Sequence, residues 1–387
     1  MRGIRGSPGN VRVCGVRTLI VGGGVLGTMH ALRALELGHE VVQVEREPEA
    51  RGASVRNFGL VWVSGRRPGP ELELAMRARR AWERIAADVP DLGFRANGSL
   101  TVVRTAGELA AAEDFAGRAD AAERGAELLG PAEVRALNPA LRGDLLGALW
   151  CEQDAAVEPR TAQPALRAHL AATGRYTWSP GREIREVGPG WARDDAGQRY
   201  EADLVVLCTG AALGGLVREL RPELPVRRVR LQMMQTEPLD EPLPTSVADG
   251  DSMRYYPAYR SAALDALGDA EPQPPVAADN GMQLLVVQRR DGGLTIGDTH
   301  DYAEPFPFDV REDPYDHLAT RAAELLGRPL PRISRRWAGV YAQTRDPEVV
   351  VHREQVLSGV WLVTGPGGRG MTCSPAIAED TFREVRG

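Results

Sequence analysis

The side chains with the clearest capacity for chemistry are arginines, tyrosines and one histidine in the second half of the chain. Arg254 and Tyr256 lie in an Arg/Tyr-rich stretch with Tyr255 and Tyr259, and His300 follows the apolar run LTIGDT. An arginine guanidinium binds a carboxylate or phosphonate through two parallel hydrogen bonds, and a tyrosine hydroxyl orients the bound group. The pattern predicts contacts to a small anionic molecule. The alternative is that these side chains have ordinary surface or structural roles.

A second chemical signal is a glycine-rich turn near the N-terminus. The apolar run at 17–21 (RTLIV) is typical of a buried parallel strand, and Gly22, Gly24 and Gly27 follow it as G-x-G-x-x-G. The first glycine permits a tight turn, the second lets the backbone approach a pyrophosphate, and the third lets a helix pack on the strand.

The elements after this turn complete a nucleotide-binding unit. An amphipathic stretch up to Gly38 predicts a helix, and residues 41–44 predict a second strand that ends at Glu45. A carboxylate at this place can accept hydrogen bonds from a ribose diol. The ordered strand, turn, helix, strand and acid predict dinucleotide binding, the alternative being a glycine-rich turn that binds nothing.

Three further segments favour FAD over NAD. Small and polar residues at 53–59 (ASVRNFG) follow the second strand closely, and 201–210 (EADLVVLCTG) predict a buried strand that ends in Thr-Gly. A strand at 360–363 runs into the glycine-rich loop 364–372 (TGPGGRGMT), which opens a helix over 376–384. Backbone N–H groups at such a helix start suit the anionic edge of a reduced flavin, and an NAD dehydrogenase has no need of this second cradle.

On these residues the chain resembles the D-amino acid oxidase-type FAD-dependent oxidoreductases, which include glycine and sarcosine oxidases. The 22–27 turn with Glu45, the VVLCTG strand and the GPGGRGMT loop carry the resemblance, with weaker matches at 129–134, 137–139 and 336–341. The segments SVRNFGLVW and GPGGRGMT are similar to a subgroup linked to aminophosphonate breakdown. The resemblance implies FAD as the cofactor, held by Gly22, Gly24, Val25, Leu26, Gly27, Glu45, Arg46, Ser54, Asn57, Phe58, Gly59, Ile184, Thr209, Gly210, Gly365, Gly367, Gly368, Arg369, Gly370 and Met371.

The resemblance also implies an interleaved α/β fold. A Rossmann-type FAD-binding domain would alternate along the chain with an α+β substrate domain built on a mostly antiparallel sheet. The expected segments are a disordered leader at 1–15, the FAD-binding domain at 16–90, 145–225 and 335–387, and the substrate-binding domain at 91–144 and 226–334.

The substrate domain carries a hairpin pattern and a Pro/Ala/Asp-rich segment. Residues 283–288 and 294–297 predict the two strands of the hairpin, and Arg289 and Arg290 at its turn are expected to be solvated. Residues 269–281 read as a mobile surface loop, either a lid over the active site or an excursion without function.

In amine oxidation by a flavin, a hydride leaves the carbon that bears nitrogen and arrives at flavin N5. The cofactor performs the hard step, so no catalytic triad is expected. The resemblance implies oxidation of the C–N bond of a small anionic amine, an amino acid or aminophosphonate with N-methylated forms included, and hydrolysis of the imine to an aldehyde or keto product. A 2-hydroxy acid oxidoreductase and a flavin-binding partner subunit without turnover are the alternatives.

Further arginines are candidates around the flavin. Arg369 lies inside the second glycine-rich loop and can neutralise the flavin or reach the substrate anion, and Arg56 adjoins Asn57 on the opposite side. Arg345 lies near the place where the resemblance puts the substrate. The candidate catalytic set is therefore Arg56, Arg254, Tyr256, His300, Arg345 and Arg369.

Composition limits the classes of ligand and cofactor that the chain can be expected to bind. The net charge of −6 argues against nucleic acid or an anionic membrane as a ligand, and the apolar runs are too short to cross a bilayer. The absence of lysine excludes a Schiff-base or P-loop lysine, and it leaves oxygen or another electron acceptor open. A monomer or homodimer is expected.

Four widely spaced cysteines favour neither a disulfide framework nor a metal site, so a cytoplasmic location is expected. Cys373 stands where a covalent flavin link is conceivable, although its place at a helix start favours inward packing.

Overall fold

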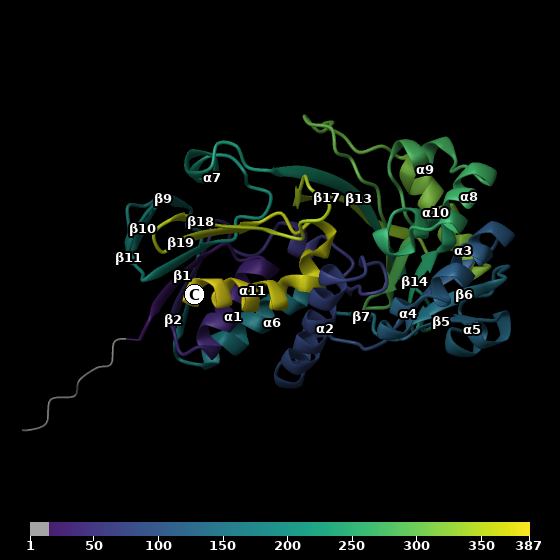
Figure 1. The fold of residues 1–387 in the computed structure, drawn as a ribbon, viewed down its shortest axis with the longest axis horizontal. Helices are drawn as coiled ribbons and strands as arrows, with labels where there is room; N and C mark the ends of the chain where they lie inside the picture. Colours follow the sequence, from purple (N-terminus) through teal and green to yellow (C-terminus); the bar gives the residue numbers. More distant parts are fainter. Residues whose placement is uncertain (1–14) are drawn as a thin grey trace, which may run out of the picture.

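The computed structural model describes residues 15–387, so the leader expected at 1–15 lies, apart from Gly15, outside the described residues. The described chain forms two halves that lie side by side along the long axis (Figure 1). One half is built on a six-stranded sheet and the other on an eight-stranded sheet. We refer to them below, after the roles that the resemblance implies, as the flavin half and the substrate half.

The six-stranded sheet is the Rossmann-type core that the sequence predicts. Its strands are short, the central ones are mainly apolar, and all neighbouring pairs are parallel except the hairpin at one edge. In spatial order the strands are β18 (His352–Leu357), β19 (Val360–Thr364), β12 (Leu204–Leu207), β1 (Arg17–Val21), β2 (Glu40–Glu45) and β8 (Tyr176–Pro180).

Helices cover one face of this sheet and a small sheet covers the other, which makes three layers. The helical layer consists of α1 (Val25–Glu36), α6 (Pro159–Ala172) and α11 (Gly370–Arg386), which are labelled in Figure 1. The opposite layer is the antiparallel sheet of β9 (Ile184–Gly188), β10 (Trp191–Asp194) and β11 (Arg199–Glu201).

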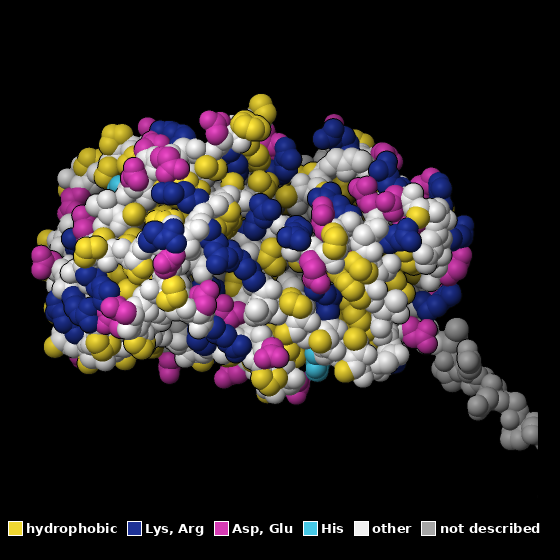
Figure 2. Space-filling model, turned by 180° about the vertical axis from the view of Figure 1, so that it is seen from behind, with side chains coloured by type: hydrophobic (Ala, Val, Ile, Leu, Met, Phe, Trp, Pro, Cys, Tyr) yellow, Lys and Arg dark blue, Asp and Glu magenta, His cyan; other side chains and the backbone are white. Residues whose placement is uncertain are grey.

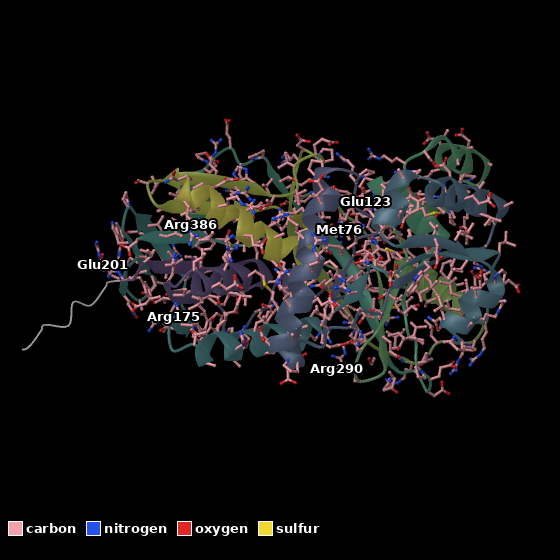
Figure 3. All side chains as sticks on the ribbon, turned by 60° about the horizontal axis from the view of Figure 1, so that its bottom comes forward. Met76, Glu123, Arg175, Glu201, Arg290 and Arg386 are labelled. Atoms are coloured by element: carbon pink, nitrogen blue, oxygen red, sulfur yellow. The ribbon has the colours of Figure 1, made fainter. Side chains whose placement is uncertain are left out.

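A long helix marks the boundary between the halves. Helix α2 (Pro70–Asp88) packs against α11, and its Met76 lies near the middle of the molecule (Figure 3). The apolar side of α2 buries Leu74, Ala75 and Ala78 in the same cluster as residues of α1 and α11. Glu71, in the first turn of α2, lines the cavity described below.

The second sheet is mostly antiparallel, as predicted, with one parallel pair between β4 and β14. In spatial order its strands are β17 (Ile333–Thr344), β13 (Val226–Pro238), β16 (Gly293–Gly297), β15 (Leu285–Gln288), β14 (Ser246–Asp249), β4 (Ser99–Val103), β6 (Gly147–Cys151) and β5 (Ala126–Leu129). The predicted hairpin corresponds to β15 and β16.

Alternate side chains of this sheet pack against two groups of helices. One face is covered by α5 (Pro131–Leu137), α9 (Pro275–Asp279) and α10 (Asp313–Leu326). The other face packs against α3 (Ala106–Ala116) and α8 (Ala262–Ala270).

Short elements connect these layers. They are the helices α4 (Ala119–Glu123) and α7 (Leu216–Leu220), the strand pair β3 (Leu60–Val61) and β7 (Ala155–Ala156), and the 3-10 turns η1 (Ala53–Val55), η2 (Pro90–Leu92), η3 (Gly250–Arg254), η4 (Pro257–Tyr259) and η5 (Gly367–Arg369).

Three local expectations are corrected by the structure. The segment 269–281 is not a structureless loop, because α8 extends into it and α9 lies within it with Ala277 fully buried. Arg289 is not solvated: it is 8% exposed and its guanidinium donates to the Phe58 carbonyl at 2.6 Å. Strand β17, most of which falls in 335–387, pairs with β13 in the substrate half.

On the face shown in Figure 2, side chains of both charge signs are interspersed. Among residues 15–387, none of the helices is long and apolar enough to pass through a membrane.

Candidate active site

A cavity of about 1060 Å³ runs from the flavin half into the substrate half. Its lining begins at the turn after β1 and reaches Tyr255 and Tyr256, which lie between η3 and η4. It is larger than a typical site for one small ligand, so it has room for a dinucleotide and a small substrate together.

Backbone geometry explains the glycines of the first turn. Gly22 has a φ of +114°, and a Cβ there would lie 2.2 Å from the carbonyl oxygen of Cys208. Gly27 does not line the cavity, because a Cβ there would lie 2.1 Å from the carbonyl oxygen of Gly22 in the strand–helix contact. Gly24 remains as the open position, where the chain passes into α1.

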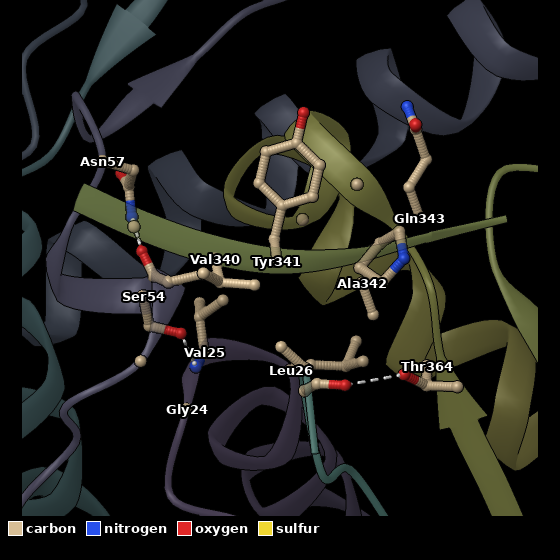
Figure 4. A pocket seen from close by; sticks show the side chains of 18 of the residues that line it. Gly24, Val25, Leu26, Ser54, Asn57, Val340, Tyr341, Ala342, Gln343 and Thr364 are labelled. Carbon is tan, nitrogen blue, oxygen red and sulfur yellow. Dashed lines mark hydrogen bonds between the residues drawn. The ribbon is translucent and has the colours of Figure 1, made fainter. Parts of the chain in front are cut away.

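Polar side chains hold this turn in place. The Val25 amide donates to Ser54 Oγ at 2.8 Å, and the Gly23 amide donates to Glu45 Oε2 at 2.6 Å. Figure 4 shows Ser54 beside Gly24 and Val25, with β17 crossing over the turn. Within residues 15–387, the Glu45 carboxylate accepts one further hydrogen bond, from the Glu47 amide at 3.0 Å, so it retains lone pairs for the hydroxyl groups of a ligand.

The second glycine-rich loop enters the cavity from the opposite end of the sequence. Gly367 has a φ of +60°, Gly368 is exposed to the cavity, and α11 begins at Gly370. Gly365 lies outside the lining and instead packs on β17, where the Thr344 amide donates to its carbonyl at 3.0 Å. The start of α11 therefore lines the same cavity as the start of α1.

These residues fit FAD. Two helix starts offer backbone donors for the pyrophosphate and for the anionic edge of the flavin, and Glu45 offers acceptors for the ribose. Thr209 Oγ1 is buried without a hydrogen-bond partner and lies in the same lining, so a polar ligand there would satisfy it.

The match to a family model agrees with this geometry. Residues 17–383 match the model described as "FAD dependent oxidoreductase" (DAO). The chain belongs to this family. It is an FAD-dependent oxidoreductase, with FAD as its cofactor.

Solved structures of the same fold are distant in sequence. The glycine oxidase of Bacillus cereus is 19% identical, with a TM-score of 0.77 over 96% of this chain and 97% of that one. The iminodiacetate oxidase of Chelativorans sp. is 18% identical, with a TM-score of 0.76 over 96% and 95%. The L-proline dehydrogenase of P. horikoshii is 17% identical, with a TM-score of 0.77 over 96% and 93%. No curated protein matches the chain.

Most of the residues predicted to contact FAD line the cavity. They are Gly22, Gly24, Val25, Leu26, Glu45, Arg46, Ser54, Asn57, Phe58, Ile184, Thr209, Gly210, Gly367, Gly368, Arg369, Gly370 and Met371. Gly27, Gly59 and Gly365 lie outside the lining. Gly59 has a φ of +70° and packs against the Val157 carbonyl, so its glycine has a structural reason.

The predicted substrate residues divide into two groups. Arg56, Tyr256, His300 and Arg369 line the cavity, whereas Arg254 and Arg345 do not. The guanidinium of Arg254 donates to Asp251 at 2.8 Å and to the Glu271 carbonyl at 2.7 Å, both outside the lining.

The substrate end of the cavity is aromatic. The ring of Tyr255 stacks on His300 with centroids 4.2 Å apart and meets Tyr256 edge-on at 5.2 Å. Trp62 lies 5.9 Å from Tyr256, and its Nε1 is buried without a hydrogen-bond partner. Burial raises the pKa of Tyr255 and of Tyr256 far above the usual range, so both hydroxyls stay protonated.

Two buried arginines share one carboxylate at this end. Glu71 lies 3.9 Å from Nη1 of Arg66 and 3.6 Å from Nη1 of Arg369. Arg369 is held by further bonds to Pro366, Thr344 and Val349, and desolvation lowers its pKa. The Arg66 guanidinium makes one hydrogen bond, from Nε to the Trp62 carbonyl at 2.8 Å. The group carries one net positive charge, and Arg66 retains donors for an anion.

Arg66 and Asp298 were missed by the sequence reasoning. Arg66 follows the flavin-proximal segment FGLVWVSG, and Asp298 stands two residues before the predicted His300. In an extended segment, residues i and i+2 lie on the same face. The prediction of His300 could therefore have included Asp298. For Arg66 no comparable signal exists.

Cys373 is fully buried in the core of the flavin half and does not line the cavity. Burial raises the pKa of its thiol to about 11, which leaves little thiolate for reaction.

Proposed function

We propose that the protein oxidises the C–N bond of a small amine that carries an anionic group, either an amino acid or an aminophosphonate, with N-methylated substrates included. FAD, when bound, supplies the acceptor for the hydride that leaves the carbon next to nitrogen. The resulting imine hydrolyses to an aldehyde or keto product. The residues of this chain bind the two ends of the substrate and keep water out.

The observation that carries the proposal is the position of Arg66. Arg66 is 6% exposed and lines the same cavity as both glycine-rich turns, and its guanidinium retains donors that residues 15–387 do not use. A buried guanidinium fork suits a carboxylate or a phosphonate. Arg369, held beside it through Glu71, adds to the positive potential there.

The names of the structural neighbours support the amine class. Glycine oxidase, iminodiacetate oxidase and L-proline dehydrogenase are named for amines that also bear a carboxylate. The aromatic walls formed by Trp62, Tyr255 and Tyr256 suit a small organic substrate whose polar ends are bound by a few placed side chains.

The test is reduction of the purified flavoprotein under anaerobic conditions. Glycine, sarcosine, 2-aminoethylphosphonate and its N-methyl derivative are each mixed with the protein while the flavin absorbance is followed. Bleaching by at least one of them is expected. Bleaching by glycolate but by none of the amines would favour a 2-hydroxy acid oxidoreductase, and no bleaching by any of these compounds would contradict the proposal.

Admission of air then identifies the electron acceptor. Fast return of the flavin colour indicates an oxidase, and slow return indicates a dehydrogenase that uses another acceptor.

A further inference from the structure

Asp298 is a buried carboxylate in the substrate end of the cavity. It is 4% exposed, lies directly after β16 and belongs to the cavity lining. Its Oδ1 accepts one hydrogen bond, from Gln283 Nε2 at 3.1 Å. Among residues 15–387, no arginine or histidine nitrogen lies within 4 Å of this carboxylate, although most buried carboxylates in proteins have such a partner.

The groups that face Asp298 are mainly aromatic. His300 lies two residues further on, with Nδ1 2.9 Å from the Gly281 carbonyl, and four tyrosines approach from η3, η4, β17 and the segment after His300. The carboxylate contributes to the raised pKa of each of these tyrosines, which are Tyr255, Tyr256, Tyr302 and Tyr341.

A carboxylate surrounded by aromatic rings is complementary to an alkylammonium group. The negative faces of the rings attract a cation. The carboxylate attracts it further, because no cationic side chain of the described residues pairs with Asp298. The same surroundings disfavour an anion, which Arg66 would instead bind. The two ends of a small zwitterionic substrate therefore find opposite charges within one cavity.

We propose that Asp298 binds the ammonium group of the substrate and accepts its proton, which leaves the neutral amine that can be oxidised. This inference rests on the proposed oxidation of an amine. In the step, one N–H bond of the ammonium breaks, an O–H bond forms at the Asp298 carboxylate, and the nitrogen keeps the electron pair. After the product has left, Asp298 releases this proton to solvent and is again a carboxylate.

The main test is the pH dependence of flavin reduction in Asp298→Asn. In the wild-type enzyme the ratio of the reduction rate to the substrate Kd should rise with pH through the pKa of Asp298, which burial raises, and then become level. In D298N the same ratio should be at least about tenfold lower at neutral pH and should keep rising until the amine itself loses its proton in solution. Superimposable profiles for the two proteins would overturn the proposal.

A control variant separates this effect from loss of a nearby charge. Asp301 lies three positions later, outside the cavity lining, and pairs with Arg230 at 3.5 Å. Asp301→Asn should retain the wild-type profile. A D301N profile that changed in the same way as that of D298N would overturn the assignment to Asp298.

A binding measurement does not depend on turnover. Methylammonium and acetate are titrated separately into the oxidised holoenzyme, and the flavin spectrum is followed. Methylammonium should bind at least about tenfold more weakly to D298N than to the wild type, whereas acetate should not distinguish them. Equal methylammonium binding by both proteins, or none by the wild type, would overturn the proposal even if no amine is ever turned over.

The wild-type enzyme alone provides the test if D298N does not fold. Its affinity for methylammonium should fall as the pH drops through the pKa of Asp298, because protonation removes the countercharge. Its affinity for acetate should not fall over the same range. A methylammonium affinity that is independent of pH would again overturn the proposal.

Discussion

The two ends of the cavity are lined in different ways. At the flavin end, Gly22 and Gly367 place backbone N–H groups through positive φ angles, and few side chains are needed. At the substrate end, Arg66, Asp298 and the aromatic rings line the cavity with their side chains, which come from separate segments. The glycine turns at the flavin end are determined by neighbouring residues. The set of side chains at the substrate end depends on the three-dimensional fold, which brings distant segments together.

The largest expected effect tests the backbone end. Gly24 has φ −74° and ψ 176°, which any residue can adopt, and a Cβ there would meet only the movable Ser54 Oγ at 2.9 Å. Gly24→Val should therefore fold but block the approach of the pyrophosphate. We expect FAD affinity to fall by about 1000-fold, roughly 4 kcal/mol, measured by titration of the apoprotein with FAD.

Gly117→Ala is the matched control, since Gly117 ends α3 away from the cavity with a φ of −76°. It should bind FAD as the wild type does. If Gly24→Val also retained FAD, the backbone at this turn would not be the part that holds the phosphates.

The difference between the two ends explains which features could be predicted. The strand–turn–helix units at 17–36 and 360–386 need only neighbouring residues, so the sequence sufficed to predict them and the Rossmann-type sheet. Glu45 was found for the same reason, because its distance along the chain from Gly22 is set by one helix.

Side-chain partners that are distant in sequence could not be predicted. Arg289 was expected in solvent because it lies at a hairpin turn, yet Glu158 and the Phe58 carbonyl, both far along the chain, bury it. Arg254 had a local signal that was not used: Asp251, three residues earlier, already pairs with it. An arginine with an acidic neighbour at this spacing is a weaker candidate for a ligand than one without.

The second prediction concerns acid stability of the flavin half. His30 on α1 is fully buried, with its ring nitrogens 2.7 Å from the Leu26 carbonyl and 3.0 Å from Thr381 Oγ1 on α11. Desolvation lowers its pKa from 6.5 to about 4, so its neutral form stabilises the fold above pH 6.5. That contribution, roughly 3 kcal/mol, should be lost as the pH falls from 6.5 towards 4.

The measurement is the thermal midpoint, with flavin release recorded in parallel, from pH 8 to pH 4. His30→Gln should lower the midpoint at pH 8 and make it less dependent on pH, whereas His169→Gln, at a half-buried position on α6, should keep the wild-type slope. A His30→Gln protein with the full wild-type acid sensitivity would show that another group causes it.

The third prediction concerns the substrate half, where the contribution of a buried group to stability falls as the pH rises. Asp249 is 3% exposed, accepts from Ser252 and lies 3.5 Å from Arg321, and desolvation raises its pKa from 3.8 to about 6. Its neutral form is the one that the fold favours, so the contribution is present below about pH 4 and is lost as the pH rises through 6. The span between the two pKa values is smaller than for His30, so the effect should be slightly smaller.

Asp249→Asn should remove this loss, which a series of urea unfolding curves between pH 4 and pH 7 would detect. Asp240→Asn, at an exposed position paired with Arg328, serves as its control. If the unfolding free energy of Asp249→Asn still fell between pH 4 and pH 6 as much as that of the wild type, the contrast between the halves would lose its basis.

The smallest expected effect separates the arginine chosen from the sequence from the one chosen from the structure. Arg66→Gln should weaken binding of an anionic substrate or acetate by about 30-fold, roughly 2 kcal/mol, because it removes charge-assisted hydrogen bonds while Arg369 remains beside Glu71. FAD binding should not change. Arg254→Gln should alter the same Kd by less than about twofold, since Asp251 and the Glu271 carbonyl occupy its guanidinium away from the cavity. The Kd of acetate, obtained from its perturbation of the flavin spectrum, measures the effect of each variant. A larger loss of acetate affinity in Arg254→Gln than in Arg66→Gln would place the anion site in the stretch around Arg254 that the sequence favoured.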